Sequence, residues 1–479
     1  MMNAIPFPTP DRSIVERREA IVAALAQLLP AASLVTDGAE LRAFETDAFT
    51  AYRRVPLAVA LPTTTAEVSA VMAYCHRARV KVVPRGAGTS LAGGAIPLED
   101  SIVLCVSKMS RVLEVDYPNR FVHVEAGVTN LAVTQAVAPD GFFYAPDPSS
   151  QLACTIGGNI GMNSGGAHCL KYGVTVNNLL GVKMVLVDGS IVDLGGPQHD
   201  AAGIDLLSVV CGSEGQIGIV TEATLRIVPS PEGARPVMIG FSSCEHAGDC
   251  VAAIIAAGMI PVAIEYMDRL AVEICEAFAG AGYPLDVEAL LIVEVEGGEA
   301  EIAEQLARIT ALARDRGATV VRESASAIEA AQIWKGRKSA FGATGRIADY
   351  ICMDGTVPTG RLGETLRRSY EIVARHGLRV ANVFHAGDGN MHPLIMYDVN
   401  DPDAQRRAEA AGDDILKLCV EVGGCLTGEH GVGIEKRDLM RFQFTEVELA
   451  QQMRTRAAFD PGGLLNPGKV FPLDMEQAS

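Results

Sequence analysis

Glycine-rich segments constrain the fold of this chain more than any other feature of its sequence. Three of them lie in the first half, at 84–94, 146–166 and 212–222. Glycine adopts backbone conformations that other residues avoid, so such segments predict tight loops whose consecutive N–H groups turn toward one anion. The 48 glycines make up about a tenth of the 479 residues, against a usual share of roughly 7%. We therefore expect a ligand bound largely by backbone loops.

The first segment follows a predicted strand at 81–83 and reads Pro-Arg-Gly-Ala-Gly-Thr-Ser-Leu-Ala-Gly-Gly. A loop of this kind can hold a pyrophosphate without lysines. It lacks the G-x-G-x-x-G spacing and helix start of a Rossmann turn, and also the G-K-[ST] of a P-loop. Taken alone, it is equally well explained as an ordinary tight connection between strands.

The three segments together are more specific. Pro146 and Pro148 fix the entry to the second segment, and its small residues leave room for a flat ring system against the main chain. In order and spacing, the segments resemble the FAD-binding domain of the vanillyl-alcohol oxidase (p-cresol methylhydroxylase) family. The resemblance implies FAD that is not covalently attached, because Thr89 lies in the loop where covalent members often carry a histidine. The implied FAD-binding residues are Arg85, Gly86, Ala87, Gly88, Thr89, Ser90, Pro146, Asp147, Pro148, Gly157, Gly158, Asn163, Gly165, Glu214, Gly218, Ile219 and Asn466.

Charge and composition exclude several classes of protein. The net charge of -18, without a Lys/Arg-rich tract, argues against nucleic-acid binding. No segment reaches the roughly 20 apolar residues of a transmembrane helix, and the start lacks a signal pattern. The eleven cysteines are scattered singly, as expected for reduced thiols and not for an iron–sulfur motif. We expect a cytoplasmic protein, or one held peripherally at the inner face of the membrane through partners.

The predicted secondary structure separates the chain into parts. Helices and strands alternate up to about residue 228, including a tight hairpin at Asp188-Gly189, and Pro229, Pro231 and Pro236 then mark a linker. Two β-α-β units follow, which predict an α+β domain with helices on one face of its sheet. We expect an FAD-binding domain at 1–232, a substrate or cap domain at 233–425, and a segment at 426–479 that returns to the FAD domain. The predicted fold class is thus α+β, a two-subdomain FAD module of the vanillyl-alcohol oxidase type with an inserted cap.

Histidines bracketed by glycines form a second constellation. His385 and His392 flank a Gly-Asp-Gly turn between two apolar runs, which would place them side by side across a hairpin. Glu429, in a Gly-Glu-His-Gly motif, could supply a third ligand. Two histidines and one carboxylate would leave coordination positions open for substrate. The alternative for any single histidine is a half-buried turn residue bonded to backbone, but for the three motif histidines together, at 385, 392 and 430, we favour function.

The resemblance extends over almost the whole chain. The motifs that carry it lie at 144–158, 168–173, 334–338, 353–358, 385–393, 428–433 and 460–469. They resemble the FAD subunits of bacterial glycolate oxidases and the related D-lactate and D-2-hydroxyglutarate dehydrogenases. This implies oxidation of a small D-2-hydroxy acid, with His385, His392 and Glu429 as ligands of a divalent metal (Zn, Mn or Fe), His430 as base and Arg337 on the substrate carboxylate. Electrons would leave through a partner iron–sulfur subunit, a quinone or a cytochrome.

Two departures narrow the substrate, and several alternatives stay open. Leu394 and Cys352 stand where the hydroxyglutarate-type relatives carry a polar residue and a lysine, so glycolate or D-lactate is preferred over a dicarboxylate. The alternatives are a D-2-hydroxyglutarate dehydrogenase, a flavin-containing transferase without redox chemistry, and a non-catalytic subunit that keeps the fold. The alternative for Arg337 itself is a solvated charge on a helix.

Overall fold

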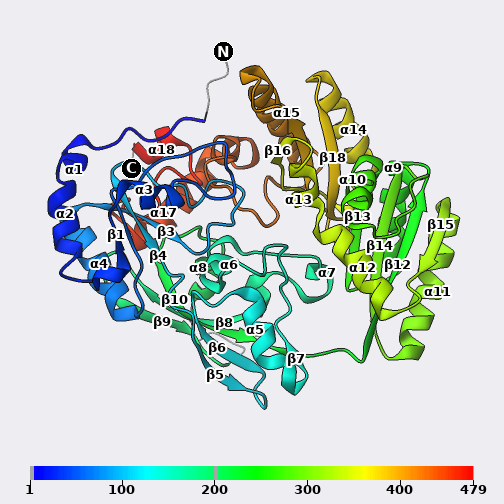
Figure 1. Cartoon of the computed structure of the whole chain (residues 1–479), viewed down its shortest axis with the longest axis horizontal. Helices are drawn as coiled ribbons and strands as arrows, with labels where there is room; N and C mark the ends of the chain where they lie inside the picture. The colour runs from blue at the N-terminus through cyan, green and yellow to red at the C-terminus, as the bar shows by residue number, and fades with distance from the viewer. Residues whose placement is uncertain (1–4, 199–202, 478–479) are drawn as a thin grey trace. The chain divides into compact units, whose positions relative to one another are not determined.

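The computed structural model describes residues 5–198 and 203–477, and these form two compact units (Figure 1). The split unit consists of three stretches, 5–165, 173–230 and 429–477, and the insert unit of two, 166–172 and 231–428. The predicted domains include residues 1–4, 199–202 and 478–479, which lie outside the described residues. The assignment of FAD binding and substrate binding to particular stretches stays a prediction.

The helices and strands of the split unit alternate in its first two stretches. Its helices are α1 Arg12–Glu16, α2 Arg18–Leu25, α3 Gly38–Leu41, α4 Thr65–Ala78, α5 Asn130–Val137, α6 Ile156–Met162, α8 Leu206–Val210, α16 Met440–Gln443, α17 Glu446–Phe459 and α18 Leu473–Gln477. Its strands are β1 Leu34–Val35, β2 Ala58–Ala60, β3 Lys81–Arg85, β4 Ser101–Cys105, β5 Val112–Asp116, β6 Phe121–Glu125, β7 Phe142–Phe143, β8 Leu179–Val185, β9 Ile191–Gly195, β10 Ile219–Arg226 and β11 Val228–Pro229.

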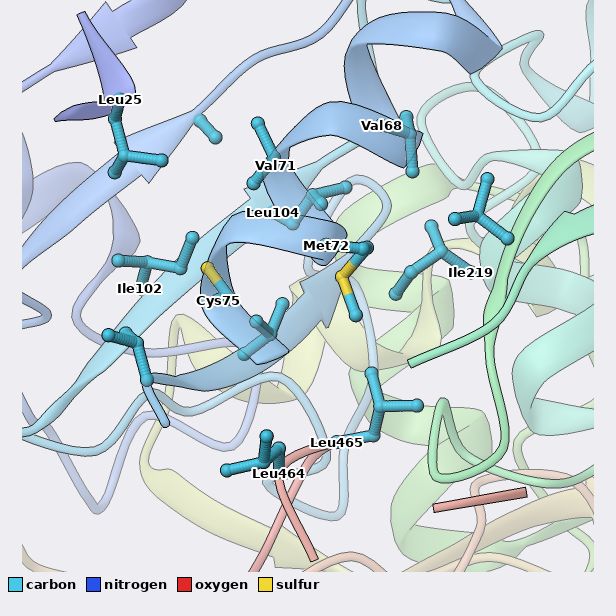
Figure 2. Close-up of a cluster of buried hydrophobic side chains, with 14 of the residues drawn as sticks. Leu25, Val68, Val71, Met72, Cys75, Ile102, Leu104, Ile219, Leu464 and Leu465 are labelled. Carbon is cyan, nitrogen blue, oxygen red and sulfur yellow. The ribbon is translucent and has the colours of Figure 1, made fainter. Parts of the chain in front are cut away.

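The first sheet of the split unit has the order β1-β2-β4-β3, with β2, β4 and β3 parallel. Helix α4 begins at Thr65, because the Thr64 side chain accepts a hydrogen bond from Glu67 N. Its apolar residues pack on this sheet together with Leu464 and Leu465 from the third stretch (Figure 2). Val82 N donates to Leu464 O at 2.9 Å, so the third stretch lies alongside β3. The core of this unit therefore needs residues that are nearly 400 positions apart in sequence.

The second sheet of the split unit, β5-β6-β10-β8-β9, is antiparallel throughout. The hairpin predicted at Asp188-Gly189 is confirmed: Val185 pairs with Ile191, and Gly189 has a φ of 92°. The second glycine segment differs from the expected loop, since 156–162 is helix α6. The Thr155 side chain accepts from Gly158 N, and the buried Ile156 and Ile160 give the helix its packing face.

The insert unit is an α+β unit built on one large antiparallel sheet. Its strands are β12 Gly233–Phe241, β13 Ala263–Asp268, β14 Ala289–Gly297, β15 Ala318–Glu323, β16 Asp349–Cys352, β17 Gly355–Thr356, β18 Arg379–His385, β19 Asn390–Met391 and β20 Pro393–Tyr397. The strand order is β15-β12-β14-β13-β18-β19-β17, and β20 pairs with both β18 and β16. Its helices are α7 Cys169–Tyr172, α9 Cys244–Ala256, α10 Arg269–Ala279, α11 Glu299–Asp315, α12 Ala327–Lys338, α13 Ala340–Gly345, α14 Leu362–Arg375 and α15 Pro402–Glu421.

Helices cover both faces of this sheet, so the prediction of helices on one face is wrong. Leu290 and Ile292 of β14 pack in a cluster with residues of α10, α12 and α13. Side chains alternate along a strand, so Leu291 and Val293 point to the opposite face, and they too are fully buried. Helices α9 and α11 contact β12 and β14 (Figure 1). The cause is the near-continuous apolar run of β14, which requires cover on each side.

Two predicted absences are also testable in the described residues. No helix among them is long and apolar enough to cross a membrane. All eleven cysteines lie within the described ranges and none forms a disulfide, in agreement with the expected thiols.

Candidate functional site

The predicted histidine pair lies on the hairpin of β18, β19 and β20 in the insert unit. His385 ends β18 opposite Asn390, and His392 directly precedes β20. The two rings are 5.2 Å apart between centroids and nearly perpendicular, at 88°. The side chains are almost completely buried, with residue exposures of 5% for His385 and 1% for His392. The sequence prediction that the Gly-Asp-Gly turn brings these two histidines together is confirmed.

The turn between the histidines depends on Gly389. Its φ is 75°, in the left-handed region, and a Cβ at this position would lie 2.0 Å from the backbone oxygen of Val357. Only glycine therefore fits both the conformation and the close approach of the neighbouring backbone.

Both imidazoles are held through the same ring atom. His385 Nδ1 lies 2.7 Å from Glu265 Oε1, and His392 Nδ1 lies 3.3 Å from the backbone oxygen of Met353. A carboxylate or carbonyl oxygen only accepts, so each Nδ1 carries the proton and each Nε2 carries the lone pair. This is the form in which a histidine binds a metal ion through Nε2.

Glu265 connects His385 to Arg337. Glu265 Oε2 lies 2.6 Å from Arg337 Nη2, an ion pair in which both residues are buried, at 0% and 3% exposure. Burial raises the pKa of Glu265, but the charge of Arg337 and the hydrogen bond from His385 outweigh it, and the pKa lies below its usual value. Arg337, on α12, is therefore not the solvated helix charge considered as the alternative.

Sequence reasoning missed Glu265. It stands in the middle of β13, in the strand Ala-Ile-Glu-Tyr-Met-Asp, and its register partner across β13 and β18 is His385. The available signal was a carboxylate in the middle of a buried strand, where charged residues are rare unless paired. What the pattern could not supply was the partner strand, whose His385 is 120 residues away.

The guanidinium of Arg337 is only partly hydrogen-bonded. Its Nη2 faces Glu265 Oε2 at 2.6 Å, whereas its buried Nε has no hydrogen-bond acceptor among the described residues. Arginine is suited to binding carboxylates because its planar guanidinium presents several N–H donors. On the same helix, Trp334 Nε1 donates to Glu294 Oε1 at 2.8 Å.

The Glu-His motif begins the third stretch of the split unit. Glu429 Oε2 accepts from Gly165 N at 3.1 Å, and His430 Nε2 lies 4.0 Å from Glu429 Oε1. The next residues are fixed by Glu214, whose carboxylate accepts from Val432 N at 2.6 Å and from Gly433 N at 2.8 Å. Burial raises the pKa of Glu214. This predicted FAD-binding residue therefore directs its side chain to the loop after His430.

The glycine segments converge within the split unit. A Cβ on Gly86 would lie 2.2 Å from Thr155 Oγ1, so the first and second segments approach each other closely. Glu214 N donates to Gly161 O at 2.8 Å, which joins the third segment to the second. Asn466 Nδ2 donates to the backbone oxygens of Gly94 and Glu214, at 3.0 and 2.7 Å. The predicted FAD-binding segments thus form one cluster, which consists of loops and helix α6.

Individual residues of this cluster have different roles. The Arg85 guanidinium donates to Thr46 O at 2.7 Å, and burial lowers its pKa. Asn163 ends α6 in a left-handed conformation and accepts from Val176 N. Ile219 belongs to the hydrophobic core, so only its backbone is available to a ligand. The close packing of Gly86 against Thr155 and Gly158 fits a site that binds FAD mainly through main-chain groups.

Comparison with protein families agrees with this geometry. The family model "FAD linked oxidases, C-terminal domain" matches residues 230–470, and the model "FAD binding domain" matches residues 56–195. The chain belongs to the FAD-linked oxidase family. The family assignment makes it an FAD-dependent oxidoreductase, as the sequence resemblance predicted.

Individual members of the FAD-linked oxidase family match over nearly the full chain. Glycolate oxidase subunit GlcD of Escherichia coli (strain K12) is 47% identical over 456 residues, covering 95% of this chain and 91% of the relative. GlcD of Bacillus subtilis is 37% identical, covering 89% and 92%. A D-lactate dehydrogenase of Archaeoglobus fulgidus is 35% identical, covering 86% and 90%.

Solved structures confirm the predicted fold class. 4-Ethylphenol oxidase from Gulosibacter chungangensis superposes with a TM-score of 0.82 at 16% identity, covering 98% of this chain and 99% of that one. p-Cresol methylhydroxylase gives 0.81 at 15% identity, with the same shares. At such identities the likeness concerns the fold alone, which is that of the vanillyl-alcohol oxidase type.

Proposed function

We propose that this chain oxidises a small D-2-hydroxy acid, glycolate or D-lactate, to the 2-oxo acid with non-covalent FAD. The observation that carries the proposal is the buried pair of His385 and His392, both held by Nδ1, together with the buried guanidinium of Arg337, whose Nε has no acceptor among the described residues. The names of the relatives, glycolate oxidase subunit and D-lactate dehydrogenase, support this substrate class.

The residues fit a divalent metal held by His385, His392 and Glu429. The two imidazoles present Nε2 lone pairs, and a carboxylate adds the oxygen ligand that Zn, Mn and Fe accept. Gly428 N donates to Asp354 O at 2.8 Å within the insert unit. Glu429 is the next residue, so its Cα is about 3.8 Å from that of Gly428. A bound metal ion would lower the pKa of the substrate hydroxyl group.

The remaining roles belong to the chain's own residues. Arg337 binds the substrate carboxylate, and His430 accepts the proton of the 2-hydroxyl group. FAD, when bound, accepts the hydride from C2. Cys352 and Leu394 are register partners on β16 and β20, and both are buried. Neither side chain can bind a second carboxylate, which favours the smaller substrates.

The electrons leave through a second protein. The E. coli and B. subtilis relatives are named as subunits, which supports an assembly that contains further chains. The scattered cysteines of this chain lack the spacing of an iron–sulfur site, so we assign the cluster to a partner, with a quinone or cytochrome as the other acceptors.

Anaerobic reduction of the flavin tests the reaction. We expect glycolate or D-lactate to bleach the FAD absorbance of the purified protein, and L-lactate to leave it unchanged. The kcat/KM for D-2-hydroxyglutarate should be lower by a factor of roughly ten or more, because its second carboxylate has no partner. Bleaching by none of these acids would refute the proposed oxidation, and preference for D-2-hydroxyglutarate would refute the assigned substrate size.

Metal analysis tests the ligand set separately. The double variant His385→Ala/His392→Ala should lose a stoichiometric divalent metal while FAD remains bound. His376→Ala is the matched control, since His376 is a histidine of the same unit that is bonded to Asp414 at 3.2 Å, away from the hairpin. Unchanged metal content in the double variant would refute the assignment.

A further inference from the structure

The carboxylate of Glu265 bridges two groups that the proposed reaction uses separately. One oxygen lies 2.7 Å from His385 Nδ1 and the other lies 2.6 Å from Arg337 Nη2. The bridge lies within the insert unit. The backbones of Glu265 and His385 are fixed relative to each other, because these residues are register partners across β13 and β18.

The bridge occupies a place where a charge is costly. All six residues of β13 are buried, and the neighbouring Ile264, Tyr266 and Met267 are apolar or aromatic. A buried carboxylate is tolerated when it is paired and hydrogen-bonded, and removal of its partners would leave an uncompensated charge. Such an arrangement is expected where the charge positions other groups.

The sheet supplies a natural comparison within the same strand. Asp268 is a second buried carboxylate of β13, only three residues further on. Its oxygens accept from Ala271 N, Asn382 N, Asn382 Nδ2 and the Tyr370 hydroxyl group. These partners are backbone and neutral groups that cap α10 and join strands. Asp268 thus has an architectural role, whereas Glu265 contacts His385 and Arg337.

We infer that Glu265 is a positioning residue that holds His385 with its proton on Nδ1 and holds the Arg337 guanidinium beside the same site. The inference rests on the proposed function, because it assigns His385 to the metal and Arg337 to the substrate carboxylate. The side chain of Glu265 thus determines which nitrogen of His385 binds the metal. The same side chain determines how the guanidinium of Arg337 is oriented. Metal affinity and substrate affinity are therefore coupled through Glu265.

Replacement of Glu265 by glutamine is the sharpest change. A glutamine has almost the same shape but only one acceptor oxygen, and two donors, His385 Nδ1–H and Arg337, compete for it. If the oxygen turns to the arginine, the amide N–H groups face His385 Nδ1 and favour the opposite tautomer. We expect E265Q to bind the divalent metal roughly 10–100-fold more weakly, as measured by competition with a chelator.

Three further measurements make the result specific. D268N should keep the metal affinity of the wild type even if its thermal stability falls, and both variants should keep FAD. E265D retains two oxygens on a shorter side chain and should restore part of the lost affinity. In metal-free protein labelled with 15N-histidine, the His385 resonances should report a protonated Nδ1 in the wild type and a shift toward protonated Nε2 in E265Q.

The outcomes separate the two proposals. Wild-type protein that binds no divalent metal refutes the metal site of the proposed function, and the 15N spectra then still decide whether Glu265 sets the tautomer of His385. Equal metal affinity of the wild type and E265Q, or unchanged His385 resonances, would overturn the role of Glu265. Equal losses in E265Q and D268N would reduce it to a structural residue. If E265Q does not fold, E265D with the same measurements provides the test.

Discussion

Asp47 shows how strongly one buried residue of the split unit is affected by its surroundings. Its carboxylate accepts hydrogen bonds from Phe49 N at 2.9 Å and from Ala95 N at 3.2 Å. Burial raises its pKa from 3.8 to about 6, and these hydrogen bonds with the charges of Arg85 and Lys469 only partly oppose the shift. The folded protein therefore binds a proton at Asp47 more tightly than the unfolded chain does.

This shift predicts a pH dependence of stability. A raised carboxyl pKa contributes stability that is present below pH 3.8 and is lost as the pH rises through about 6. The loss amounts to about 3 kcal/mol at 1.36 kcal/mol per pKa unit. D47N lacks this titration, so its thermal midpoint relative to the wild type should rise between pH 4.5 and 7.5. A difference between the two midpoints that stays constant over this range would contradict the assignment.

The histidine hairpin is the element on which the candidate site depends. Gly389 allows the turn, and the backbone oxygen of Val357 occupies the space that a side chain would need. Leu170 from the short stretch 166–172 packs on the same turn, since a Cβ at Gly387 would lie 2.6 Å from its Cδ2. The positions of His385 and His392 therefore follow from backbone geometry as much as from their own contacts.

We expect Gly389→Ala to lower the metal content of the folded protein and to leave FAD bound. The methyl group would displace β19 from Val357, and the left-handed conformation adds a strain of roughly 1 kcal/mol. Gly377→Ala is the matched control. Its φ of 67° is similar, but its nearest neighbour is the Arg407 side chain at 3.4 Å, which can move. Loss of metal from both variants would assign the effect to backbone strain alone. Loss of metal from neither would contradict the proposal that the turn at Gly389 positions the two histidines.

Local sequence signals predicted individual turns and strands far better than they predicted which strands pair with each other. The hairpin of His385 and His392 was predictable because Gly-Asp-Gly lies within the same short segment. The Asp188-Gly189 hairpin was predictable for the same reason. Glu265 was not, because its importance arises from strand pairing between β13 and β18. Helix α6 was missed because its glycines indicated a loop, while the Thr155 cap and the burial of Ile156 and Ile160 favoured a helix.

At the scale of the whole molecule, the chain passes between its two units four times within residues 5–477. The shortest stretch between two such crossings is 166–172, which packs in the insert unit. Lys171 Nζ lies 2.9 Å from Glu296 Oε1, and the Tyr172 hydroxyl group donates to the same carboxylate. Glu296 is buried on β14. One carboxylate thus anchors this stretch by two contacts.

Removal of that charge should release the stretch. Glu296→Gln weakens both contacts, and a loss of about 1.4 kcal/mol would raise the population of the open form tenfold. We therefore expect trypsin to cleave after Lys171 about tenfold faster in this variant, as followed by mass spectrometry under native conditions. Glu299→Gln removes the partner of Arg235 at the start of α11 and should have no effect. Equal cleavage rates for Glu296→Gln and the wild type would show that the anchor lies elsewhere.

The pairing of Leu464 with Val82 has a consequence for biosynthesis. The insert unit contains no residue beyond 428, so all of its strands have been synthesised while the ribosome is still translating the third stretch of the split unit. The core under α4, in contrast, lacks Leu464 and Leu465 until that stretch emerges. Domains generally fold as units during translation. The part of the protein that begins first along the messenger is thus completed last, after the whole insert unit has been synthesised.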